Sequence, residues 1–167
     1  MSDPFVTKNI LKWYDLNKRS LPWRKNVSKE KRQYNTLISE FMLQQTQVAT
    51  VIPYFNKFVK EIPNIKKLAC VDNKKLIKLW EGLGYYSRAR NLKKAAQSVI
   101  KNFNGVIPDN FDDLKSLSGI GDYTANAILA IAFNKPHIPL DGNVERIIKR
   151  YLYLKKEKEI QLSLIHI

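Results

Sequence analysis

Apolar residues recur at the spacing of an α-helix through most of the chain. Leu37, Ile38, Phe41 and Met42, for example, fall three or four positions apart, on one face of a helix. The same spacing predicts helices near 6–17, 48–59, 74–80, 89–103, 111–117, 124–133 and 144–154, with breaks at Pro53, Pro63, Pro108, Pro136 and Pro139. A loop at 21–23 and a charged connector at 25–32 are expected between the first two helices. Because no long run alternates with a period of two, the sequence predicts an all-α fold.

Positive charge dominates the composition. The 167 residues include 29 lysines and arginines against 15 acids, which gives a net charge of +14. An excess of this size favours a polyanionic partner, DNA or RNA. No signal peptide, basic amphipathic anchor or long apolar run favours a membrane.

Cysteine and histidine are scarce. The one cysteine, Cys70, excludes an intramolecular disulfide and a multi-cysteine metal site, and it fits a reducing cytosol. The two histidines, His137 and His166, lie too far apart in sequence to form a recognisable metal motif. We therefore expect no metal site built from this chain.

The segment 117–121, Leu-Ser-Gly-Ile-Gly, predicts a tight hairpin that opens into an alanine- and isoleucine-rich helix. Gly119 and Gly121 let the backbone turn and come close to another chain. The N-terminus of the following helix then presents unpaired N–H groups, which favours a bound phosphate. Asp141 follows in Leu-Asp-Gly-Asn. Each feature alone is typical of an ordinary turn, so the prediction of chemistry on a nucleic acid depends on their combination with the positive charge.

Gly82–Ser87 and Gly119–Thr124 form a faint internal repeat. Each contains a glycine hairpin followed by an aromatic residue, a hydroxyl residue and a helix. The first of these helices carries the cations Arg88, Arg90, Lys93 and Lys94. Either one turn type is used twice beside a solvated basic face, or both hairpins contact a DNA backbone.

Four motifs stand out: SEFMLQQTQV at 39–48, GLGYYSRARNL at 82–92, LSGIGDYTANAI at 117–128 and LDGNV at 140–144. Together they resemble the helix-hairpin-helix DNA glycosylases and, within them, the MutY-type adenine glycosylases. The match runs from about Leu21 to Arg150. The resemblance implies the helix-hairpin-helix glycosylase fold and base excision repair, with removal of adenine mispaired with 8-oxoguanine or guanine in double-stranded DNA.

The resemblance also implies roles for single residues. Glu40 corresponds to the catalytic acid and Asp141 to the aspartate that stabilises the sugar cation. The other implied positions are Tyr123 and Asn143 as polar partners of that aspartate, Gln44, Gln45 and Tyr85 as probes or wedges of the base stack, Gly119 and Gly121 as the phosphate hairpin, and Arg88 as a further DNA contact.

Physical chemistry supports two acids with different protonation states. A stacked adenine must leave the duplex before it can be cut, and it is a poor anionic leaving group, so an acid must protonate a ring nitrogen. Glu40 lies at the margin of an apolar stripe, where desolvation would raise its pKa. We expect the Glu40 and Asp141 carboxyl groups to face one cavity, about 5–10 Å apart.

Tyr123 decides the expected subtype. Related glycosylases that also cleave the strand have a lysine at this position, whose amine forms a Schiff base with the sugar. A phenol cannot do so, which predicts a monofunctional glycosylase. Two alternatives stay open: an endonuclease III-like pyrimidine glycosylase/lyase, and a non-catalytic helix-hairpin-helix module that only binds DNA.

Further expectations follow from the resemblance. The protein is expected to be a monomer of the bacterial cytosol and nucleoid. The family implies a 4Fe-4S cluster held by four cysteines beyond this sequence, so we expect no cofactor in the chain itself. A separate 8-oxoguanine-recognition domain of the family is likewise not expected here.

The expected catalytic domain covers residues 1–161. It divides into a six-helix part at 21–135, with the hairpin at 117–124, and a second helical subdomain formed by 1–20 and 136–161. Residues 162–167 match a translated sequencing adapter, so we expect them to be an artefact of a truncated gene. Truncation would leave apolar residues of the first and last helices exposed, namely Val6, Ile10, Trp13, Ile147, Ile148, Tyr151 and Leu154. It would also make the chain marginally stable and prone to aggregation, with weak or absent glycosylase activity.

Overall fold

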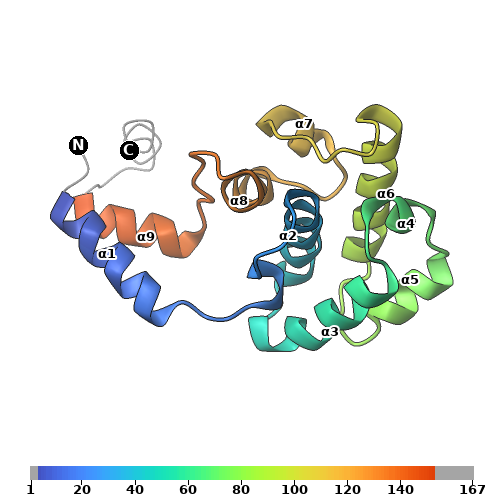
Figure 1. Cartoon of the computed structure of the whole chain (residues 1–167), viewed down its shortest axis with the longest axis horizontal. Helices are drawn as coiled ribbons and strands as arrows, with labels where there is room; N and C mark the ends of the chain where they lie inside the picture. The colour runs from blue at the N-terminus through green and yellow to red at the C-terminus, as the bar shows by residue number, and fades with distance from the viewer. Residues whose placement is uncertain (1–3, 153–167) are drawn as a thin grey trace. The chain divides into compact units, whose positions relative to one another are not determined.

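The computed structural model describes residues 4–152, which form helices joined by short connections (Figure 1). The elements are α1 (Pro4–Asn17), the 3-10 helix η1 (Pro22–Arg24), α2 (Lys29–Leu43), α3 (Val48–Glu61), α4 (Ile65–Cys70), α5 (Asn73–Trp80), α6 (Ser87–Asn102), α7 (Phe111–Ser116), α8 (Asp122–Phe133) and α9 (Gly142–Leu152). Since these described residues include no strand, the all-α prediction is confirmed.

The chain divides into two compact units. One comprises residues 21–139, and the other comprises the chain up to Ser20 together with the chain from Leu140 onward. The limits of the catalytic domain and of its two parts, as expected from the sequence, stay a prediction. Leu154 and the segment 162–167 lie outside the described residues.

Helix α2 occupies the centre of the unit 21–139. It packs against α3, α6, α8 and η1, and every residue from Gln33 to Met42 is buried as a result. Its N-terminus is capped by Ser28, whose hydroxyl oxygen accepts a hydrogen bond from the N–H of Lys31 at 3.3 Å. The prediction of a connector up to residue 32 was therefore wrong. The charged side chains at 29–32 extend into solvent, while the capped backbone is already helical.

The break predicted at Pro53 was also wrong, because Pro53 lies inside α3. Proline costs a helix interior about 3 kcal/mol, since it removes one backbone hydrogen bond and crowds the preceding turn. Here Pro53 is on the exposed side of the helix. On the opposite side α3 buries Val51, Phe55 and Phe58, and we attribute the continuity of the helix to that packing.

Two short helices were missed in the sequence. The expected loop after Ser20 contains η1, whose Trp23 is buried against Phe55 with the ring centroids 5.3 Å apart. The second is α4, which begins after Asn64, a side-chain cap for the N–H of Lys67 at 2.9 Å. Both are shorter than two turns, so periodicity carries little signal for them.

The second unit contains α1 and α9. Helix α1 buries none of its described residues, and it exposes large side chains such as Phe5 and Leu16. The apolar residues predicted to be exposed divide into two groups. Exposed are Ile10, Trp13, Ile147 and Tyr151, and half-buried are Val6 and Ile148. The exposure prediction is thus confirmed for four of the six that the structure describes.

Candidate active site

The hairpin at 117–121 connects α7 to α8, and its two glycines have different structural roles. Gly119 has φ +83°, and a Cβ atom there would lie 2.8 Å from Cε1 of Phe41 and 2.9 Å from Cβ of Asn91. Both conformation and packing therefore require glycine. Gly121 is extended and precedes the first turn of α8, and a Cβ atom there would meet nothing within 4 Å. This open side leaves room for a phosphate to reach the first N–H groups of α8.

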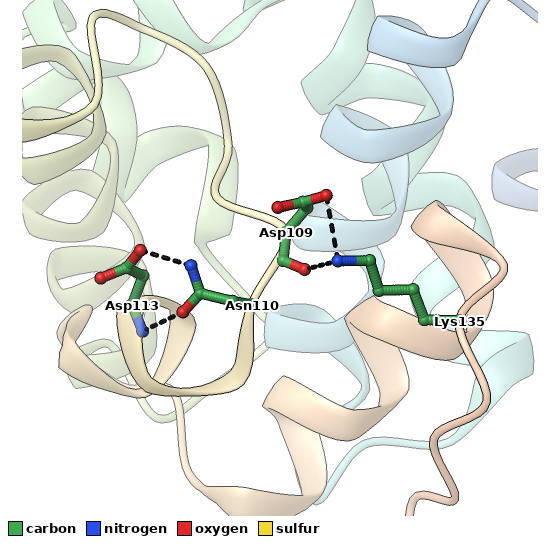
Figure 2. A network of polar contacts seen from close by, with 4 residues as sticks. All are labelled: Asp109, Asn110, Asp113 and Lys135. Atoms are coloured by element: carbon green, nitrogen blue, oxygen red, sulfur yellow. Dashed lines mark hydrogen bonds and ion pairs between the residues drawn. The ribbon is translucent and has the colours of Figure 1, made fainter.

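A polar clasp joins the segment before α7 to the segment after α8 (Figure 2). The Lys135 ammonium donates to the backbone carbonyl of Asp109 and pairs with its carboxylate at 3.0 Å. Next to it, Asn110 caps α7 by accepting from the N–H of Asp113 at 2.9 Å, and its side-chain amide donates to the Asp113 carboxylate. The contact between Lys135 and Asp109 therefore links the start of α7 to the end of α8, at the helix ends that are away from the hairpin.

Glu40 lies in the last turn of α2 and is 7% exposed. Burial raises the pKa of Glu40 from 4.5 to about 7, because a charged carboxylate loses its hydration there. The positive charge of Arg24, in η1, acts in the opposite direction and lowers that pKa. Glu40 is thus positioned to hold and release a proton near neutral pH.

Two loops next to this helix contain non-glycine residues with left-handed backbone. Gln45, just after α2, has φ +56°, and Tyr85, just before α6, has φ +45°. Both residues are exposed, and 63% of Tyr85 is accessible to solvent. The neighbouring Gln44 donates from its side-chain amide to the carbonyl oxygen of Gly119 at 3.2 Å. The structure therefore brings the predicted base-probing residue Gln44 to the predicted phosphate hairpin.

Arg88 is buried between these two loops. One guanidinium nitrogen donates to the carbonyl oxygens of Phe41, Met42 and Gln44, and the other donates to those of Leu83 and Gly84. Only 7% of the residue is exposed. The role of Arg88 as a DNA contact stays a prediction, and both terminal nitrogens of its guanidinium donate to backbone carbonyls.

Tyr123 is the second residue of α8 and is 44% exposed. It lies directly after Asp122, in the turn that follows the open side of Gly121. A side chain at this position is accessible from solvent beside the predicted phosphate site.

Asp141 and Asn143 belong to the unit that contains α9. Asp141 caps this helix, since its Oδ1 accepts from the N–H of Asn143 at 2.9 Å and from that of Val144 at 2.8 Å. The side-chain oxygen of Asn143 accepts a hydrogen bond from Arg146 at 2.7 Å. The Asp-Gly pair is thus a helix start as well as a turn. The distance between Glu40 and Asp141 stays a prediction.

The matching family model is described as the HhH-GPD superfamily base excision DNA repair protein, and it matches residues 38–164. The chain belongs to the HhH-GPD superfamily.

Two relatives are adenine DNA glycosylases of Buchnera aphidicola. The one from subspecies Baizongia pistaciae (strain Bp) is 46% identical over 145 residues, covering 86% of this chain and 40% of that protein. The one from subspecies Acyrthosiphon pisum (strain APS) is 44% identical over 171 residues, covering 100% and 48%. The chain therefore spans less than half the length of these relatives.

A solved DNA glycosylase structure supports the same fold. A thermostable thymine-DNA glycosylase superposes with a TM-score of 0.82 at 25% identity, covering 96% of this chain and 76% of that chain. The expected helix-hairpin-helix glycosylase fold is therefore confirmed.

The 4Fe-4S cluster implied by the resemblance does not fit the residues of this chain. Such a cluster needs four thiolates, and this sequence has the single cysteine Cys70, which is exposed. Within residues 4–152 there is also no group of three or more His, Cys, Asp or Glu side chains arranged to hold a metal ion. We therefore assign no step of the chemistry to a cluster.

Sequence reasoning missed one charged neighbour of the acid in this HhH-GPD chain. Arg24 was not selected, although it directly follows the anchoring Trp23. A buried tryptophan next to a cation could have indicated a side chain fixed near the core.

No described helix is long and apolar enough to cross a membrane.

Proposed function

We propose that this protein is a monofunctional adenine DNA glycosylase, which hydrolyses the bond between adenine and deoxyribose where adenine is mispaired with 8-oxoguanine or guanine. One observation carries the proposal most directly: Glu40 is a buried acid whose pKa is raised to about 7 within a helix-hairpin-helix fold. An acid of that pKa can protonate a base at neutral pH. The relatives named adenine DNA glycosylase support adenine as the base removed.

The proposed partner is double-stranded DNA. The net charge of +14 favours binding to phosphates, and the open side of Gly121 supports a backbone contact at the start of α8. The exposed, left-handed Gln45 and Tyr85 are suited to enter the base stack, where the tyrosine ring can stack on a base. They would occupy the space left by an extruded adenine.

In the proposed reaction Glu40 donates its proton to a ring nitrogen of the extruded adenine. The bond between adenine and the sugar then breaks, and its electron pair leaves with the neutral base. We assign stabilisation of the resulting sugar cation to the Asp141 carboxylate, with Tyr123 and Asn143 as its polar partners. Water adds to the sugar carbon and loses a proton, which returns Glu40 to its acid form. The products are adenine and an abasic site.

The hydrolytic outcome is proposed because the residue at the position of the lyase amine is Tyr123. A phenol does not form a Schiff base, so the strand should stay intact after base release. This distinguishes the proposal from an endonuclease III-like lyase. A module that merely binds DNA would have no use for a buried acid of raised pKa such as Glu40.

The test is single-turnover release of adenine from labelled duplexes with adenine opposite 8-oxoguanine, guanine or thymine, compared with a duplex carrying an oxidised pyrimidine. We expect alkali-labile abasic sites in the first two duplexes only, with no strand break before alkali. Glu40→Gln should abolish release while duplex affinity stays within about twofold. Cleavage of the oxidised pyrimidine duplex, or binding without release from any mispair, would overturn the proposal.

A further inference from the structure

Gln45 and Tyr85 share an unusual backbone conformation. Left-handed φ values are costly for residues with a Cβ atom, and they persist only where surrounding contacts impose them. The two residues belong to different loops, one after α2 and one before α6. Contacts with the surrounding structure must therefore stabilise the left-handed backbone in each loop.

Arg88 makes stabilising contacts of this kind in both loops. Its guanidinium donates to the carbonyl oxygen of Gln44, directly before Gln45, and to that of Gly84 at 3.2 Å, directly before Tyr85. In addition, the Arg88 Cζ atom lies 5.5 Å from the centroid of the Tyr85 ring, within cation–π range. One side chain thus fixes the peptide that precedes each left-handed residue.

The charge and shape of arginine suit this position. A planar fork can donate in two directions at once, toward α2 through one nitrogen and toward residues 83–84 through the other. The carbonyl oxygens of Phe41 and Met42 belong to the last turn of α2, where no intrahelical donor is available to the final carbonyls. Arg88 therefore also caps the helix that contains Glu40.

We propose that Arg88 is a positioning residue, which couples the 44–46 and 83–86 loops into one rigid element and so presents Gln45 and Tyr85 together to the base stack. The role of this element at the base stack rests on the proposed function, whereas the coupling of the two loops can be tested without assuming that function. Arg88 acts through the loops and need not contact the nucleic acid.

The coupling is tested by hydrogen exchange on the free protein. The Thr46 N–H donates to Leu43 at 3.2 Å and the Leu83 N–H donates to Trp80 at 3.0 Å, so each reports on one loop. In Arg88→Met we expect both amides to exchange at least about tenfold faster, since both lose the contact that fixes their loop. The matched control is Arg90→Met, an exposed cation on the same helix, which should change neither. Faster exchange in only one loop, or in neither, would overturn the coupling.

The role in base extrusion is tested with two duplexes. One has adenine opposite 8-oxoguanine, and the other has adenine opposite a stable abasic analogue, where less stacking and pairing must be broken. Arg88→Met should slow single-turnover release at least about tenfold on the first and clearly less on the second. A variant that is simply damaged in its fold would lose the same factor on both duplexes, and that result would refute the positioning role.

A second variant covers the case in which Arg88→Met fails to fold. Arg88→Lys keeps the charge, but a single ammonium group cannot serve both loops, so the exchange of at least one loop should rise. Wild-type exchange rates in Arg88→Lys would overturn the proposal. If the wild-type protein released no adenine, the proposed function would fail, whereas the exchange measurements would still decide the coupling.

Discussion

The side-chain amide of Gln44 donates a hydrogen bond of 3.2 Å to the carbonyl oxygen of Gly119. This contact joins the C-terminal end of α2 to the hairpin before α8, two segments that are far apart in the sequence. Gly119 in turn packs directly against Phe41 of the same helix. The loop proposed to probe the bases and the hairpin proposed to bind a phosphate are thereby held in one unit, so a phosphate bound at the hairpin would fix the position of Gln44 and Gln45 along the DNA.

The two glycines of the hairpin should respond differently to the same substitution. Gly119→Ala should destabilise the fold by roughly 2 kcal/mol or more, because it adds a left-handed alanine and a clash with Phe41. Gly121→Ala should change stability by less than about 1 kcal/mol, because its backbone is extended and its surroundings are open. Urea unfolding of both variants checks this. A similar loss of stability in the two would contradict the assigned roles.

Gly121→Ala should instead weaken DNA binding. A methyl group at the open side would stand where the backbone is proposed to approach a phosphate. We expect a severalfold lower affinity for duplex DNA in a fluorescence anisotropy titration, with the folded protein intact. Unchanged affinity would show that the phosphate is bound elsewhere.

Adenine release should depend on the protonation of Glu40. Since burial raises the pKa of Glu40 to about 7, the rate constant should be level below that pH and fall with increasing pH above it. Single-turnover rates measured from roughly pH 5.5 to pH 9 provide the profile. A rate that rises through pH 7 would assign Glu40 the role of a base.

The same group should make stability depend on pH. The pKa of Glu40 is higher in the folded state, about 7, than its ordinary value of 4.5, so the folded protein keeps the proton longer. Its contribution to stability is full below pH 4.5 and is lost as pH rises through 7, by up to roughly 3 kcal/mol. Glu40→Gln should remove this loss, which urea unfolding at both ends of the interval would detect. An unchanged pH dependence in the variant would refute the assignment.

The exposed Arg24 should affect the pH at which Glu40 loses its proton. Its positive charge lowers the pKa of Glu40, so Arg24→Met should raise that pKa and move the alkaline fall of the rate to higher pH. Lys25→Met is the matched control, because Lys25 is an exposed neighbouring cation that is not among the causes acting on Glu40. Equal profiles for the two variants would exclude a specific effect of Arg24.

Tyr123→Lys should introduce covalent chemistry. An amine at the solvent-accessible start of α8 could attack the sugar carbon and form a Schiff base, which borohydride traps as a stable adduct. The wild-type protein and Tyr123→Gln should give no adduct. Failure of the lysine variant to trap DNA, while adenine release continues, would place Tyr123 away from the sugar.

The sequence by itself determined the class of fold and the helices with clear periodicity. The stripe of Leu37, Ile38 and Phe41 marked α2, and the basic composition indicated a polyanionic partner, because both signals depend only on side-chain type and spacing. The glycine pair at 119 and 121 marked the hairpin for the same reason. The raised pKa of Glu40 was also anticipated from its place beside an apolar stripe.

Only the tertiary structure decided how these parts act on one another. Packing of Val51 and Phe55 keeps α3 continuous through Pro53, against the local preference. The charge of Arg24, on a different helix, lowers the pKa of Glu40, and Arg88 donates to the carbonyl oxygen of Gln44, 44 positions earlier in the sequence. The sequence showed Arg88 as one cation of a basic helix, whereas the fold buries it. Burial and charge neighbours depend on which elements meet in space, and periodicity within one helix contains no information about its partner.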